Sequence, residues 1–82
     1  MYEIVFTKKA EKDFDLLEHG LKQRVVQVLE RIRLGPKPFL KRLSGTDSYR
    51  LRVGDYRVII DLEKSKKGLV VLRIGHRKNI YD

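Results

Sequence analysis

The stretch that most constrains the fold is "SYRLRVGDYRVII", residues 48–60, in which apolar and polar side chains alternate on both sides of a Gly-Asp pair. This alternation predicts two strands, at about 49–53 and 56–63, and the glycine suits the tight turn of a β-hairpin. Pairing across that turn sets Arg52 opposite Arg57. Like charges directly opposite one another destabilise a sheet by roughly 0.2–1 kcal/mol, so the hairpin holds a repulsion that needs an explanation.

Two helices are expected between residues 7 and 35, because apolar residues recur there at helical spacing. Thr7 can cap the first helix and Gly20 can end it. The second helix is expected to begin at Leu21 and to end at Gly35-Pro36. The buried positions predicted for the two helices are Ala10, Phe14 and Leu17, then Val25, Val28, Leu29 and Ile32.

The remaining strands are a β-branched and aromatic run at 2–6 and a nearly continuous apolar run at 69–75, which is typical of a central strand. The predicted order is β-α-α-β-β-β, an α+β fold in which an αα-hairpin packs on one face of a mainly antiparallel sheet. One domain is expected over residues 1–82. Alternation turns the apolar residues of the hairpin strands toward the helices. The positions left on the open face are Arg50, Arg52 and Arg57.

Composition favours a polyanionic partner. The 82 residues include 19 Lys and Arg against 11 Asp and Glu, a formal charge of +8, which indicates binding to nucleic acid or to an acidic protein. The chain has no cysteine, which excludes disulfides and thiolate metal sites and agrees with a cytoplasmic location. No apolar run approaches the roughly 20 residues of a membrane span, and the N-terminus does not resemble a signal peptide.

Arg73 and Arg77 share an alternation phase on the last strand and its extension, so they are expected to extend the open face into a basic strip. Guanidinium groups bind phosphate bidentately, although a solvated sheet face is the alternative explanation. Arginine stays protonated and can therefore only stabilise developing charge. Cleavage of RNA through its 2′-OH needs a proton acceptor or donor from elsewhere.

The candidates for proton transfer are His76 and Tyr81, in "GHRKNIYD". Histidine exchanges protons near neutral pH. Strict alternation places His76 on the face opposite Arg77, unless the strand ends at Gly75 and frees the side chain to turn. Tyr81 can stack on a base, donate to the leaving oxygen or simply close the edge of the core.

The other ionisable residues are expected to be structural. His19 is interpreted as a C-terminal residue of the first helix. The acidic residues of that helix lie mostly on its outer surface, and none is spaced with a histidine as metal ligands are, so no metal is predicted. They are Glu11, Asp13, Asp15 and Glu18.

The segments "KRLSG", "YRLRVGDYRVII" and "RIGHRKNIYD", in this order, resemble the RelE/ParE toxin superfamily of bacterial and archaeal toxin–antitoxin modules. The resemblance covers essentially the whole chain and implies the same β-α-α-β-β-β fold. For the RelE branch it implies an endoribonuclease without a cofactor that cuts messenger RNA in the ribosomal A site and arrests translation. The implied reaction is in-line 2′-OH attack, leaving a 2′,3′-cyclic phosphate and a 5′-OH.

The resemblance also implies roles for single residues. Arg57 matches an arginine that stabilises the transition state, Arg77 matches a C-terminal arginine of the site, and Tyr81 matches a tyrosine near the chain end. Arg50 and Arg52 stand where the best-known members carry lysines. Because arginine cannot release a proton, the base here would be His76 or a water.

The implied partners are messenger RNA on the ribosome and a RelB-like antitoxin, whose acidic or amphipathic segment would suit a basic toxin. Leu16, Leu21 and Leu34 lie outside the main apolar stripes and are expected to receive it. Two alternatives stay open. One is a ParE-type inhibitor of DNA gyrase without catalysis, and the other is a nonenzymatic RNA-binding or repressor component.

Overall fold

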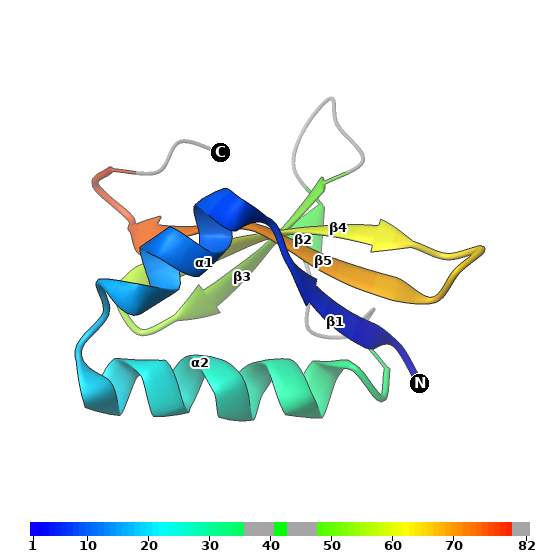
Figure 1. Ribbon diagram of the computed structural model, residues 1–82, viewed down its shortest axis with the longest axis horizontal. Helices are drawn as coiled ribbons and strands as arrows, with labels where there is room; N and C mark the ends of the chain where they lie inside the picture. Colours follow the sequence, from blue (N-terminus) through cyan, green and yellow to red (C-terminus); the bar gives the residue numbers. More distant parts are fainter. Residues whose placement is uncertain (36–40, 43–47, 80–82) are drawn as a thin grey trace.

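The computed structural model of the chain describes residues 1–35, 41–42 and 48–79. Five strands form one sheet in the order β1-β5-β4-β3-β2, in which β1 runs parallel to β5 and the other neighbours are antiparallel (Figure 1). The elements are β1 (Glu3–Phe6), α1 (Lys8–Asp15), α2 (His19–Ile32), β2 (Lys41–Arg42), β3 (Ser48–Val53), β4 (Tyr56–Glu63) and β5 (Gly68–His76). The predicted α+β order is confirmed, with the addition of the two-residue strand β2 between α2 and β3.

The β3–β4 hairpin has the predicted register. Val53 pairs with Tyr56 and Arg52 with Arg57, directly across the turn. Gly54 has φ 59°, a left-handed conformation that other residues adopt only with strain. The turn therefore requires glycine at this position, and it fixes which hairpin side chains share a face.

The helix hairpin differs from the prediction in where the chain turns. Thr7 caps α1 as expected, accepting a hydrogen bond from the Ala10 N–H at 3.1 Å. Gly20 is not the end of α1, however: α1 ends at Asp15 and α2 begins at His19, so Gly20 lies in the first turn of α2. Leu17 is buried as predicted, but it lies in the connection between the two helices rather than in the first helix. His19 is the first residue of the second helix rather than the last of the first.

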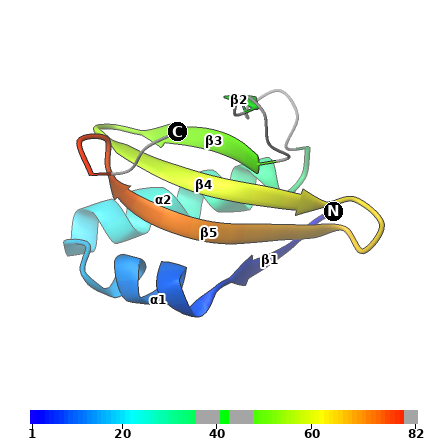
Figure 2. The same ribbon diagram turned by 90° about the horizontal axis from the view of Figure 1, so that it is seen from above.

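The core lies between the helices and the sheet face that α2 crosses (Figure 2). Alternate residues of β3 and β4 are buried there as predicted, as are Val25, Leu29 and Ile32 of α2, whereas Val28 is half-buried. The fully buried large side chains are Leu29, Ile32, Ile60, Leu69, Val25, Val58 and Val71. No helix in the described part of the chain is long and apolar enough to cross a membrane.

β5 is the predicted central strand, but its alternation is interrupted. The register with β4 shifts between Ile59 and Ile60, so that Ile59 pairs with Arg73 and Ile60 with Val71. Leu72 is the extra residue of this irregularity, and it packs with Ile59 on the face away from α2. Because of the shift, Val71 and Ile74 both reach the core although they are three positions apart.

Candidate nucleic-acid interface

The hairpin arginines lie on the sheet face away from the main core. Arg52 is exposed and lies opposite Arg57, while Arg50 lies opposite Ile59. Arg50 and Arg57 are half-buried, and each has an interaction partner within the chain. The three hairpin arginines therefore share the open face, as predicted, but only Arg52 is exposed there.

The backbone of Arg77 lies at the turn end of the sheet. Arg77 follows the last residue of β5, is exposed, and its N–H donates to the Asp55 carbonyl oxygen at 2.9 Å. This bond carries the β4–β5 pairing one position beyond His76, next to the β3–β4 turn. Gly75, the residue opposite Arg57, contributes no side chain between the two arginines. We call Arg50, Arg52, Arg57 and Arg77 the arginine cluster.

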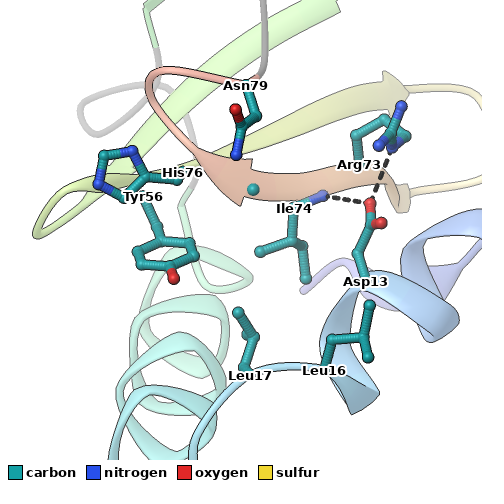
Figure 3. A pocket seen from close by; sticks show the side chains of 9 residues that line it. Asp13, Leu16, Leu17, Tyr56, Arg73, Ile74, His76 and Asn79 are labelled. Carbon is teal, nitrogen blue, oxygen red and sulfur yellow. Dashed lines mark hydrogen bonds and ion pairs between the residues drawn. The ribbon is translucent and has the colours of Figure 1, made fainter.

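Arg73 does not lie free in a basic strip, because it forms an ion pair with Asp13. Its Nε donates to Asp13 Oδ2 at 2.8 Å, and the Ile74 N–H donates to the same oxygen at 2.9 Å (Figure 3). Asp13, expected on the outer surface of its helix, faces β5, and its side chain is only 16% exposed. Its carboxylate is thus used to hold α1 against the strand.

The topology explains this contact. β1 pairs with β5 only from Gly68 to Val71, so the rest of β5 has no neighbouring strand on that side. α1 lies along this edge instead (Figure 2). The Thr7 hydroxyl donates to the Leu72 carbonyl oxygen at 3.1 Å, and Asp13 accepts from Ile74 two residues later. Side chains of α1 therefore replace the hydrogen bonds of a missing strand.

His76 lies on the opposite face from Arg57. It is the last residue of β5, so the strand does not end at Gly75, and the alternation from Ile74 to His76 is regular. Its ring packs edge-on against Tyr56, with 5.4 Å between the ring centroids. Its Nδ1 accepts a hydrogen bond from the Lys78 N–H at 3.2 Å. The ring is therefore oriented on the helix side of the sheet.

A pocket of about 270 Å³ opens beside this histidine, between the end of α1 and the end of β5. Figure 3 shows the rings of Tyr56 and His76 lying to one side of it, with Asn79 and Asp13 on other sides. Leu17 and Ile74 contribute apolar surface. The pocket lies on the far side of the sheet from Arg57, so it is separate from the arginine cluster.

Arg24 is a cation near the site that the sequence did not indicate. A Cβ built on Gly54 would lie 3.2 Å from Nη1 of Arg24, so this guanidinium from α2 lies against the β3–β4 turn. Arg24 is not among the positions predicted for the buried face of the second helix. Its position at the turn depends on how α2 packs beneath the sheet, which no local pattern encodes.

The arrangement can bind and stabilise negative charge near the β3–β4 turn. Guanidinium groups suit the oxygens of a phosphate, but they do not transfer protons. Tyr81, the other candidate for proton transfer, lies outside the described residues. Within the described ranges no three His, Cys, Asp or Glu side chains are grouped as metal ligands.

A family model and two related proteins that match this chain are all described as toxins. Residues 4–81 match the family model described as the ParE toxin of the type II toxin–antitoxin system parDE. Toxin RelG of Mycobacterium tuberculosis is 31% identical over 98% of this chain and 95% of its own length. Toxin RelE3 of Methanocaldococcus jannaschii is 29% identical over 98% and 96%.

Solved structures show the same fold. The archaeal RelE–RelB complex from Pyrococcus horikoshii contains a chain that matches with a TM-score of 0.82 and 27% identity, over 96% of this chain and 98% of that one. The intact Escherichia coli RelBE toxin–antitoxin complex contains one that matches with a TM-score of 0.82 and 20% identity, over 93% and 96%.

Proposed function

Because the chain belongs to the RelE/ParE superfamily of toxins from type II toxin–antitoxin systems, we propose that it is an endoribonuclease that cleaves messenger RNA in the ribosomal A site. Two curated relatives that cover nearly the whole chain are named RelG and RelE3, which favours the RelE branch. The proposal places the protein in the cytoplasm with the ribosomes and needs no metal or cofactor.

The observation that carries the proposal is the arginine cluster, in which Arg52 and Arg57 are held opposite each other despite their repulsion. A phosphate bound beside Arg52 and Arg57 is attracted by both guanidinium groups, which suit its oxygens. In the proposed reaction the 2′-oxygen attacks the adjacent phosphorus while the 5′-oxygen leaves, giving a 2′,3′-cyclic phosphate and a 5′-OH. Arg57 stabilises the charge that develops on the phosphoryl oxygens, and Arg77 with Arg50 and Arg52 holds the backbone.

Proton transfer is assigned to residues near the chain end. Tyr81 is the candidate donor to the leaving oxygen, as the family resemblance implies. His76, the other candidate, packs against Tyr56 on the face opposite Arg57, so it reaches the same phosphate only around the end of the sheet. We therefore assign Tyr81, from the family resemblance, as the donor to the 5′-oxygen and a water as the acceptor of the 2′-OH proton, because the position of His76 makes it the weaker candidate.

The proposal is tested by mapping new RNA ends in a reconstituted translation reaction. Purified protein should produce fragments with 5′-OH ends at ribosome-occupied codons, and the same messenger without ribosomes should stay intact. Messenger left uncut on translating ribosomes, with or without arrest of translation, would contradict the proposed activity.

The proposed partner is a RelB-like antitoxin, since several of the matching structures are described as RelB–RelE complexes. Leu16 and Leu34 are 86% and 68% exposed, as expected for residues that await a partner. Leu21 is half-buried and packs against the core, so it is a weaker candidate than the sequence suggested. Replacing Leu16 and Leu34 with polar residues should weaken antitoxin binding, and an unchanged affinity would place the contact elsewhere.

The second candidate function is inhibition of DNA gyrase, because the matching family model is described as a ParE toxin. That function needs no cleavage chemistry and predicts loss of supercoiling activity in a gyrase assay. A nonenzymatic RNA-binding role predicts RNA binding without any cleaved product. The mapping of RNA ends separates both from the proposed nuclease.

A further inference from the structure

The turn between β4 and β5 carries a second concentration of positive charge that the proposed cleavage site does not use. Three of its four residues are lysines, Lys64, Lys66 and Lys67, and all four are exposed. Glu3 and Glu63 lie on the flanking strands opposite Gly68. In the described part of the chain, neither carboxylate forms an ion pair with these lysines.

Lys67 has φ 51°, the left-handed region that residues with a Cβ adopt at a steric cost. Its conformation is fixed by two backbone hydrogen bonds: its N–H donates to the Lys64 carbonyl oxygen at 3.3 Å, and its carbonyl accepts from the Glu3 N–H at 2.8 Å. Glycine would occupy this position without strain. The turn therefore keeps a cation where the backbone favours glycine, and such an outlier is grounds for seeking a function.

The β4–β5 turn and the β3–β4 turn, beside which Arg52 and Arg57 pair, lie at opposite ends of β4 (Figure 2). From Arg57 to Lys64 the chain runs along β4 as an extended strand, which at about 3.3 Å per residue separates the two by roughly 20–25 Å. One phosphate cannot contact both. A long RNA can, since its backbone repeats the charge along its length.

We propose that Lys64, Lys66 and Lys67 form a second contact with the RNA phosphate backbone, away from the bond that is cleaved. The inference rests on the proposed function for the identity of the polyanion. Lysine acts on phosphate as a point charge, so this contact adds affinity and salt dependence without reading sequence.

The test compares two triple variants that each remove three positive charges. The turn variant is Lys64→Ser, Lys66→Ser and Lys67→Gly, in which the glycine also relieves the left-handed strain. The control variant is Lys8→Gln, Lys9→Gln and Lys12→Gln, at exposed positions of α1. Both carry Arg57→Ala, so that the probe stays intact.

Binding of a 20-nucleotide single-stranded RNA is measured by fluorescence anisotropy over a range of salt concentrations, and binding to purified ribosomes is measured in parallel. Three lost contacts should lower the slope of log affinity against log salt by about 2. Affinity at low salt should fall at least about tenfold for the turn variant. The control variant should change much less in both quantities.

Equal slopes and affinities for the two variants would overturn the proposal. Thermal unfolding of each variant checks that the comparison is between folded proteins, and the turn variant should be at least as stable as its parent. The readout is binding by a protein without Arg57, so it does not depend on cleavage. Failure of the nuclease assay with a clear difference in binding would refute the proposed function and leave the lysine contact standing.

Discussion

Replacing Asp13 with alanine should destabilise the fold more than replacing an exposed acidic residue of the same helix does. The carboxylate accepts from Arg73 Nε at 2.8 Å and from the Ile74 N–H at 2.9 Å, and its side chain is 16% exposed. A hydrogen bond to a charged group contributes about 1.5–3 kcal/mol. The Arg73 side chain is 41% exposed, so the ion pair adds only about 0–1 kcal/mol.

The expected loss for Asp13→Ala is therefore about 1.5–4 kcal/mol of unfolding free energy. For a domain of this size that lowers Tm by about 6–30 °C. Asp13→Asn keeps an acceptor for the Ile74 N–H but removes the charge, so it should lie between the variant and the wild type. The loss should also loosen the end of β5, from which Arg77 follows directly.

Urea denaturation monitored by circular dichroism measures these free energies. Asp15→Ala is the matched control, since Asp15 is an exposed carboxylate on the same helix, and it should change stability by less than about 0.5 kcal/mol. If Asp13→Ala were as stable as Asp15→Ala, side chains of α1 would not be replacing a strand at the edge of β5.

Three further predictions concern the hairpin and the chain end. Gly54→Ala should cost about 1–2 kcal/mol in urea denaturation because φ is 59°, and an unchanged stability would show that the turn can relax. Arg52→Thr should raise stability by about 0.2–1 kcal/mol by removing the repulsion with Arg57 while weakening RNA binding, and a clear loss of stability would contradict a net repulsion between the two side chains. In single-turnover cleavage, Tyr81→Phe should slow the reaction by about 10² or more, whereas His76→Gln should stay within about tenfold of wild type. If His76→Gln were the slower of the two variants, His76 would instead be the general base.

Local chemistry in the sequence was sufficient to predict the hairpin. A Gly-Asp turn flanked by strict alternation allows one register, and that register alone places Arg52 opposite Arg57 on the face away from the core. The helix boundary was predicted wrongly, because Gly20 is a local stop signal; the burial of Leu17 was predicted, but Leu17 lies in the connection between α1 and α2 rather than in the first helix. β2 has only two residues, too few for any periodicity to appear.

In the candidate site, only the positions fixed by the alternation of side chains along the hairpin strands could be predicted from the sequence. The pairing of Arg73 with Asp13 joins residues 60 positions apart. It depends on where β1 stops and on a register shift in β5, and neither has a signature in the sequence. Arg24 reaches the β3–β4 turn for a similar reason, through the packing of a helix against the sheet.

The central claim is that the arginine cluster is retained for transition-state stabilisation on RNA, and the cleavage rate of Arg57→Ala tests it most directly. The rate is measured in single turnover on ribosomes with a defined A-site codon, beside Arg31→Ala, which removes an equal charge from an exposed position of α2. The account predicts a rate about 10²–10³ lower for Arg57→Ala, a near wild-type rate for Arg31→Ala, and folded protein in both cases. Wild-type cleavage by Arg57→Ala would contradict it.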